Sequence, residues 1–262
     1  MEREYGQLYE RLYREHWWWR AREEFLMRQL RSLDLPPHPR VLDVGCGNGL
    51  FFDKLSTLGG EVEGIESDAA LVSSGGPRNI HIGPFDRTFA PDKRYSLILM
   101  LDVLEHLSER EAALEHAATL LEPGGYLIVT VPAFLCLWTT HDDINHHYTR
   151  YTKATFLNAA AGAPVSIVCM RYFFHFLAAI KLVVRIKERM ISTRPQPPRI
   201  PSKFVNRTML ELCRIEQRIA WLSLPFGSSL LAVTRKTKLY STWSESTTIP
   251  ITTTAWPQIV EG

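Results

Sequence analysis

The segment LDVGCGNG at 42–49 is the part of the chain best suited to bind a ligand. Gly45 and Gly47 lack a Cβ, so the backbone there can adopt unusual torsion angles and touch a ligand directly. Cys46 and Gly49 complete the same turn. A glycine-rich turn between a first strand and a first helix lies at the carboxyl end of an open α/β sheet, where such folds bind ligands. The segment therefore predicts a ligand-binding loop.

Two carboxylates indicate which ligand this loop suits. A nicotinamide-type G-x-G-x-x-G loop needs glycine at position 50, where this chain has Leu50. The carboxylate of Asp43 would repel a pyrophosphate, but it would attract an ammonium or sulfonium group. Glu66, at the end of the next expected strand, can accept both hydroxyls of a ribose. Together they predict a site for S-adenosylmethionine (SAM), a nucleoside with a cationic tail and no phosphate.

A second group of reactive side chains lies in the stretch HDDINHH at 141–147. Histidine titrates near neutral pH, so His141 or His146 can take a proton from an acceptor hydroxyl. Histidine and aspartate also bind metals, and the stretch equally fits a polar lid held by hydrogen bonds. Arg150 can bind an anionic substrate group or pair with a nearby aspartate. We expect a catalytic site without a metal, in which His141→Ala removes turnover but keeps cofactor affinity.

The elements that must position these residues follow from hydrophobic patterning. Short apolar runs alternate with helical segments from residue 40 onward, which predicts a doubly wound α/β fold with a mostly parallel sheet. A charged helix is expected at 4–32, with the aromatic residues 16–19 packed as part of a lid. Strands are expected at 41–45, 61–66, 79–83, 95–101, 126–132, 164–170 and 229–236.

The same patterning predicts the organisation of the chain. Four scattered cysteines without C-x-x-C spacing favour a reducing compartment and exclude a zinc module. The charged amino terminus and the lack of a long apolar run predict no signal peptide and no transmembrane helix, so we expect a cytoplasmic protein. The expected parts are an amino-terminal helical lid (1–39), a cofactor-binding core (40–170), a basic helical insertion (171–227), a final core strand (228–238) and a disordered tail (239–262).

Charge is unevenly distributed along the chain. Residues 171–218 contain 11 basic and three acidic side chains. The helix expected at 172–190 has an apolar body and a cationic end, so it can lie on an anionic membrane surface. It can equally cover the edge of the sheet with a solvated basic face. No nucleic-acid-binding module is recognisable, so nucleic acid is not an expected partner.

In its motifs the chain resembles the class I SAM-dependent methyltransferases. The resemblance rests on the loop at 42–49, on Glu66, on LDVLEHL (101–107) and on LLEPGGYLIVTVP (120–132). It is closest to the ubiquinone and menaquinone biosynthesis type, and it is similar to bacterial homologues associated with the cell envelope. Those homologues share three further segments with this chain, which lie here at 16–19, 141–151 and 224–236.

This resemblance implies a Rossmann-like, seven-stranded sheet of order 3-2-1-4-5-7-6 with the last strand antiparallel. It implies methyl transfer from SAM to an oxygen, carbon or nitrogen of a small-molecule, saccharide or lipid-like acceptor. Asp102, after the fourth strand, is expected to touch cofactor or substrate, and Asp86 is the candidate adenine contact. The alternative is a catalytically silent SAM-binding partner subunit.

Overall fold

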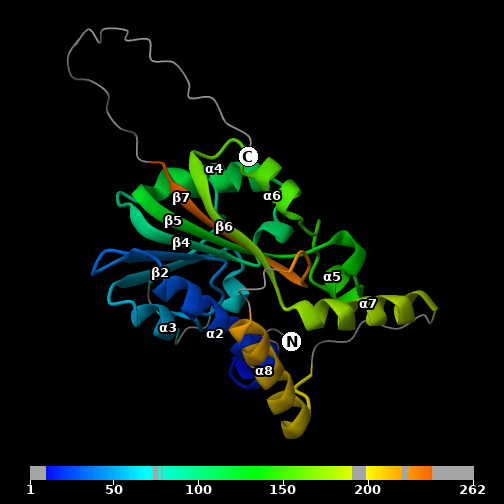
Figure 1. The fold of residues 1–262 in the computed structure, drawn as a ribbon. Coiled ribbons are helices and arrows are strands. Elements are labelled where there is room, and N and C mark those ends of the chain that lie inside the picture. The colour runs from blue at the N-terminus through cyan, green and yellow to red at the C-terminus, as the bar shows by residue number, and fades with distance from the viewer. Residues whose placement is uncertain (1–9, 73–75, 78, 191–198, 220–223, 238–262) are drawn as a thin grey trace, which may run out of the picture.

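The computed structural model of the protein describes residues 10–72, 76–77, 79–190, 199–219 and 224–237. Its strands are β1 (Arg40–Val44), β2 (Glu61–Glu66), β3 (Ile80–Ile82), β4 (Tyr95–Leu101), β5 (Leu121–Pro132), β6 (Val165–Phe173) and β7 (Ser229–Lys236). Its α-helices include α2 (Trp17–Arg31), α3 (Phe52–Ser56), α4 (Arg110–Leu120), α5 (Thr140–Ile144), α6 (Lys153–Ala159), α7 (His175–Met190) and α8 (Lys203–Arg218) (Figure 1). Short 3₁₀ turns form η1 (Ala69–Leu71), η2 (Leu104–His106) and η3 (Leu135–Leu137).

One sheet contains all of these strands, in the order β3-β2-β1-β4-β5-β7-β6. The pairs among β1 to β5 are parallel, whereas β7 runs antiparallel to both β5 and β6. The predicted Rossmann-like topology is therefore confirmed. Because parallel strands end at the same side of a sheet, the segments that follow β1, β2, β4 and β5 meet there. We call this side the carboxyl edge.

A hydrophobic core lies on each face of the sheet. On β1, Leu42 belongs to one core and its neighbour Val41 to the other, as the alternation of side chains along a strand requires. Helices α4 and α6 cover the first core, and α2, α3 and α8 contribute to the second (Figure 1). The central strands are thus buried on both sides, which explains their continuous apolar sequence.

His16 divides the helix that the sequence predicts at 4–32. Residues 10–15 are helical, but His16 is extended, with φ −78° and ψ 133°. Its Nδ1 atom accepts a hydrogen bond of 3.1 Å from the backbone N–H of Trp18, so His16 caps α2. The prediction of one continuous helix was wrong. The His16 side chain accepts a hydrogen bond from the backbone N–H of Trp18, so a new helix can begin after it, and helix propensities do not include this effect.

The basic insertion also begins differently from the prediction. Strand β6 continues to Phe173, and α7 starts only at His175, after Phe174 with φ 58°. The helix predicted at 172–190 therefore begins three residues later, and residues 172 and 173 belong to β6 instead. The tail predicted at 239–262 lies outside the described residues.

Helix α8 of this insertion packs along α2 at the other end of the sequence. The guanidinium of Arg214 makes two hydrogen bonds to the carboxylate of Glu24, of 2.8 and 2.6 Å. Asn206 Oδ1 accepts a hydrogen bond of 2.8 Å from the backbone N–H of Trp17, the first residue of α2. The insertion thereby fixes the start of α2, which reaches the carboxyl edge.

Candidate functional site

The loop predicted at 42–49 follows β1 at the carboxyl edge. Gly45, Gly47 and Gly49 all have positive φ, of 68°, 55° and 68°. A Cβ on Gly45 would lie 2.7 Å from Cγ2 of Val103, whereas nothing lies within 4 Å of the corresponding position on Gly47. The loop therefore requires glycine for its conformation, and it leaves bare backbone open to a ligand.

Glu66 holds the loop from the end of β2. Its two carboxylate oxygens accept hydrogen bonds from the backbone N–H groups of Gly47 (2.8 Å) and Asp68 (2.9 Å). Oε1 also accepts a long hydrogen bond from the Ser67 hydroxyl (3.4 Å), whereas Oε2 keeps a further lone pair that a ribose hydroxyl could use. Cys46 is half-buried against Gly64 of β2, and burial raises the pKa of its thiol, so it remains protonated at neutral pH.

Asp43 lies on β1 directly before the loop and is buried. Burial raises the pKa of its carboxyl group to about 7; the positive charge of Arg22 opposes this rise and the negative charge of Glu66 adds to it. A bound cation would favour the ionised form. The open glycine backbone, the ribose-binding carboxylate and this buried anion together fit a nucleoside with a cationic tail, so these residues fit SAM.

Cofactor affinity should therefore depend on the protonation of Asp43. The carboxyl group is mainly neutral below its raised pKa of about 7 and mainly ionised above it. Affinity for S-adenosylhomocysteine (SAH), which keeps the ammonium group, should fall by up to about tenfold per pH unit below the pKa and level off above it. Calorimetric titration at several pH values measures this. Asp43→Asn should bind SAH weakly and without this dependence, and a wild-type affinity that does not change with pH would contradict it.

Arg22 is a site residue that the sequence analysis did not identify. It projects from α2, and its Nη2 atom lies 2.7 Å from the carboxylate of Asp102. Its guanidinium also lies over the ring of Trp18, one helical turn earlier, at 5.6 Å from the ring centroid. The sequence signal was this i,i+4 spacing to Trp18, which places both side chains on one face. Arg22 thus brings a positive charge to the carboxyl edge.

Asp102 directly follows β4 at the carboxyl edge. It has a positive φ of 58°, which is uncommon for aspartate. Its backbone N–H donates to the carbonyl of Thr130 (2.9 Å), and its carboxylate accepts a hydrogen bond from the Thr130 hydroxyl (3.2 Å). Asp102 is therefore held between β5 and α2.

Glu105, His106 and His147 form a cluster beside Asp102. One possible ligand atom from each lies within 4.8 Å of the other two. Glu105 is 1% exposed, and its Oε2 atom has no hydrogen-bond partner among the described residues. Burial and the charge of Asp102 raise the pKa of Glu105 well above its ordinary value. This arrangement suits one small bound group, either a substrate hydroxyl or a divalent cation.

His147 is held by the buried ion pair of Asp142 and Arg150. Its Nδ1 atom lies 2.9 Å from Asp142 Oδ1, and the Arg150 guanidinium makes two hydrogen bonds of 2.9 Å to the same carboxylate. Burial alone would raise the pKa of Asp142, but the hydrogen bonds from His147 and Arg150 hold it well below its usual range. An ionised carboxylate only accepts hydrogen bonds, so His147 Nδ1 carries the hydrogen and Nε2 is free to accept a proton.

The other predicted histidines are on the outside of this stretch. His141 and His146 are both exposed. His141 Nε2 lies 3.1 Å from the side-chain nitrogen of Asn145, and His146 has a positive φ of 54°. Lys181 of α7 approaches the same region, where burial and the charge of Arg150 lower its pKa to about 8.

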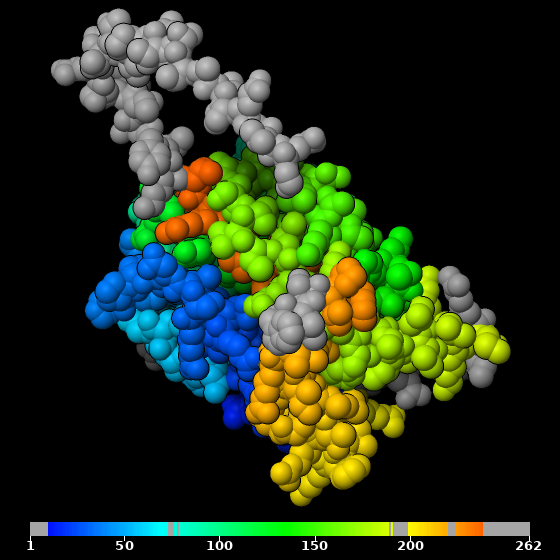
Figure 2. Space-filling view, in the orientation of Figure 1, coloured from blue at the N-terminus to red at the C-terminus, as the bar shows by residue number. Residues whose placement is uncertain are grey.

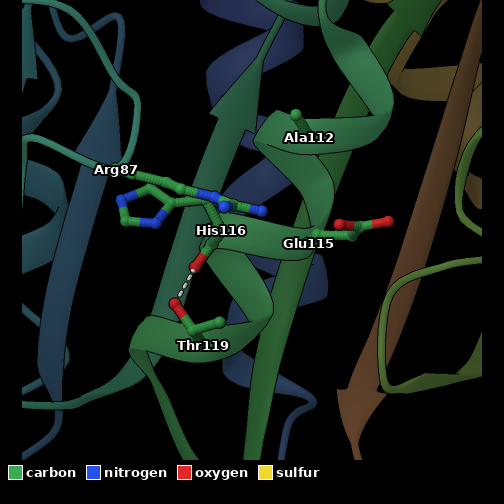
Figure 3. Close-up of a pocket in the computed structure, with 5 residues that line it drawn as sticks. All are labelled: Arg87, Ala112, Glu115, His116 and Thr119. Atoms are coloured by element: carbon green, nitrogen blue, oxygen red, sulfur yellow. Dashed lines mark hydrogen bonds between the residues drawn. The ribbon is translucent and has the colours of Figure 1, made fainter.

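Asp86, the candidate adenine contact, lies after β3 with an exposed side chain. Its carboxylate accepts hydrogen bonds from the backbone N–H (2.8 Å) and hydroxyl (2.6 Å) of Thr88. A separate surface pocket of about 320 Å³ lies on α4. Figure 3 shows its lining, which contains none of the predicted site residues: Arg87, Ala112, Glu115, His116 and Thr119.

Comparison with known sequences gives a family match over α2, β1 to β5 and the start of β6. Residues 18–169, more than half of the chain, match the family described as a methyltransferase domain. A ubiquinone biosynthesis O-methyltransferase from Rhodopseudomonas palustris is 29% identical over 113 residues, which cover 39% of this chain and 43% of that protein. The chain therefore spans less than half the length of this curated relative.

Solved structures share the fold at low sequence identity. A SAM-dependent methyltransferase from Archaeoglobus fulgidus superposes with a TM-score of 0.55 at 19% identity, over 88% of this chain and 100% of that one. Geranyl diphosphate C-methyltransferase from Streptomyces coelicolor, solved with S-adenosyl-L-homocysteine, gives 0.53 at 14% identity, over 82% and 75% of the two chains. Identities this low bear on the fold alone.

Proposed function

Since the match over residues 18–169 shows that this chain belongs to the methyltransferase domain family, we propose that it methylates a hydroxyl oxygen of a small, non-protein acceptor. The protein is a SAM-dependent methyltransferase, and the cradle of Asp43, the glycine loop and Glu66 fits that cofactor. The observation that carries the oxygen acceptor is the pair of His147 and Asp142 beside the carboxyl edge. Transfer to a hydroxyl requires removal of one proton, and a histidine oriented in this way can take it.

The choice of oxygen has independent support from relatives. The sequence alone allowed an oxygen, carbon or nitrogen nucleophile. The curated relative from Rhodopseudomonas palustris is named for transfer to oxygen. The acceptor class stays broad in this proposal: a small molecule, a saccharide or a lipid-like compound. Residues 133–151, residues 171–221 and the amino-terminal helix are proposed to form its pocket.

In the proposed mechanism, the residues around the glycine loop bind the cofactor, and the cluster of Glu105, His106 and His147 binds the acceptor. The bound cofactor supplies an activated methyl group on a sulfonium. Asp43 and Glu66 would hold it, and the ion pair of Arg22 and Asp102 lies beside the cluster of Glu105, His106 and His147. Glu105, whose pKa burial raises and whose Oε2 atom has no hydrogen-bond partner among the described residues, would hydrogen-bond the acceptor oxygen. With SAM bound, the acceptor oxygen would take the methyl group as the methyl–sulfur bond breaks and SAH leaves. The hydroxyl proton would pass to Nε2 of His147, whose Nδ1–H remains bonded to Asp142.

The remaining predicted residues keep narrower proposed roles. Asp102 is proposed to contact the cofactor or acceptor, because it accepts hydrogen bonds directly at the carboxyl edge. His141 and His146 are proposed to contact the acceptor from the exposed side of the stretch 141–147. Asp86 stays proposed as an adenine contact. We propose no metal for the reaction.

A thermal-shift titration with SAM and SAH, with NAD as the control ligand, tests the cofactor. A ligand at 100 times its dissociation constant should add about 2.7 kcal/mol to the free energy of unfolding. For a chain of this size, this corresponds to a rise in Tm of about 5–10 °C. Glu66→Ala should lose most of the rise, since Glu66 supplies both the ribose acceptors and the support of Gly47.

The outcomes separate the two proposed activities. A shift with SAH together with methylation of an acceptor hydroxyl supports the proposal. A shift without turnover on a panel of phenols, sugars and lipid-like alcohols would favour the catalytically silent partner subunit. No shift in folded protein free of bound cofactor would contradict cofactor binding itself.

We also infer peripheral contact with an anionic membrane through residues 172–190. None of the helices within the described residues has the length and hydropathy that crossing a bilayer requires. The exposed apolar residues of α7 support the proposed contact.

A further inference from the structure

Helix α7 presents its apolar side to solvent. Val183 is 66% exposed, Ile186 52% and Met190 79%, and these residues lie on one face at i, i+3 and i+7 spacing. Ile180, Leu182 and Val184 flank them and are also exposed. A helix that only covered the sheet would turn these side chains toward the core.

The opposite face of α7 is the polar one, and it contacts the protein. Glu188 accepts hydrogen bonds from the hydroxyl (2.8 Å) and backbone N–H (3.2 Å) of Thr140, at the start of α5. The Arg185 guanidinium donates to the carbonyl of Trp138. Lys181 lies on the same face and approaches Asp142 and Arg150. The first turn of α7 packs Leu177 and Ala178 into the core, but from Lys181 onward the helix is inverted relative to an ordinary surface helix.

Helix α8 has a second apolar stripe of the same kind. Leu210 and Cys213 are buried on the face toward α2. The far side carries Phe204, which is 80% exposed, together with four more exposed apolar side chains: Val205, Leu212, Ile215 and Ile219. The two helices meet where Phe176 N–H bonds the Glu216 carboxylate (3.2 Å), and both project from the lower right of the molecule (Figure 2).

Exposed cations accompany these apolar stripes. The segment 171–218 has 11 basic and three acidic residues. Within the described part of 175–218, the exposed basic side chains are Lys187, Arg199, Lys203, Arg207 and Arg218. Apolar side chains next to cations are the combination by which surface helices bind anionic lipid.

We propose that the outward faces of α7 and α8 together form one docking surface for an anionic lipid bilayer. The charge favours a bilayer over a second copy of this chain, because a symmetric dimer through this surface would bring two strongly basic segments together. This proposal adds α8 to the membrane contact that we inferred above for residues 172–190.

This surface lies directly behind the acceptor site. The polar face of α7 holds residues 138–140, which lead into α5 and Asp142. One face of α7 therefore contacts residues 138–140, and the other face is offered to the bilayer. This part rests on the proposed function, because it would favour an acceptor that reaches the enzyme from a membrane surface. Bilayer binding itself does not depend on catalysis.

Vesicle co-sedimentation of the full-length protein tests the surface without an acceptor. Vesicles contain either phosphatidylcholine alone or an equimolar mixture with phosphatidylglycerol. The anionic vesicles should bind the protein at least about tenfold more tightly. Val183→Asp on α7 and Phe204→Asp on α8 should each weaken this binding by about tenfold, because each places a carboxylate at the lipid contact. Val168→Asp, on an exposed position of β6, makes the same change in charge and should bind as the wild type does.

Cofactor binding is the control that separates this inference from the proposed function. All three variants should keep the thermal shift with SAH, because no substituted residue is near the glycine loop. Equal binding to both vesicle types would overturn the proposal. Wild-type sedimentation of both Val183→Asp and Phe204→Asp would overturn it too. So would a dimer in light scattering that these two variants dissociate, since a second copy would then occupy the surface.

Discussion

Replacing His147 by glutamine should lower methyl transfer by about 10²–10⁴-fold and leave SAH affinity unchanged. The glutamine amide can still donate a hydrogen bond to Asp142, but it cannot take a proton from the acceptor. Asp43, Gly45 and Glu66 are unaltered by this change, so cofactor binding should persist. The measurements are the initial rate with the first hydroxyl acceptor that the wild type methylates, and SAH affinity by calorimetry.

Two neighbouring histidines provide matched controls for this prediction. His141→Gln and His146→Asn remove the side chains that the sequence predicted as bases, and asparagine tolerates the positive φ at position 146. Both variants should retain more activity than His147→Gln. Asp142 orients the ring of His147, whereas no carboxylate among the described residues hydrogen-bonds the ring of His141 or His146. If instead one of them loses turnover while His147→Gln keeps it, the base is that residue and our assignment is wrong.

A divalent cation is the competing explanation for the cluster of Glu105, His106 and His147. Three ligand atoms within 4.8 Å of one another would suit a cation as well as a hydroxyl. Treatment with a chelator separates the two, and we expect the methylation rate to be unchanged. A rate that falls with chelator and returns with added Mg²⁺ or Zn²⁺ would make His147 a metal ligand and remove it as the base.

The fold was largely predictable because its signals are local. Apolar runs such as YSLILML at 95–101 match β4 in both limits, and Glu66 does end β2. The glycines at 45, 47 and 49 have the positive φ that such a loop needs. The break at His16 was not predictable from periodicity, because it depends on one side chain that caps the next helix.

The site was less predictable because its residues come from distant parts of the chain. Asp43 and Glu66 lie near the carboxyl ends of adjacent parallel strands, so the strand pattern alone places them close together. Arg22 and Asp102 are 80 positions apart, and they meet because α2 packs against the sheet. Within 141–147, the sequence cannot say which histidine faces inward. That depends on the turn after α5, which directs His147 onto Asp142 and leaves its neighbours exposed.

Arg150→Met should lower the free energy of unfolding more than any other substitution proposed for this protein. The side chains of Arg150 and Asp142 are both fully buried, with 0% exposure, and the guanidinium also donates to the carbonyl of Ala133 (3.0 Å). Arg150→Met would leave the buried carboxylate with far less compensation. The expected cost is about 3–5 kcal/mol in the free energy of unfolding, or a fall in Tm of about 10 °C or more. Thermal and denaturant unfolding measure both quantities.

An exposed pair of the same chemistry supplies the control. Arg40 lies 2.8 Å from Glu122, but their side chains are 42% and 30% exposed, so Arg40→Met should cost less than about 1 kcal/mol. Adding Asp142→Asn to Arg150→Met should restore part of the lost stability, because it removes the uncompensated charge. It should not restore turnover, since a neutral amide no longer fixes the tautomer of His147. Equal destabilisation by Arg150→Met and Arg40→Met would mean that burial does not set the strength of this ion pair.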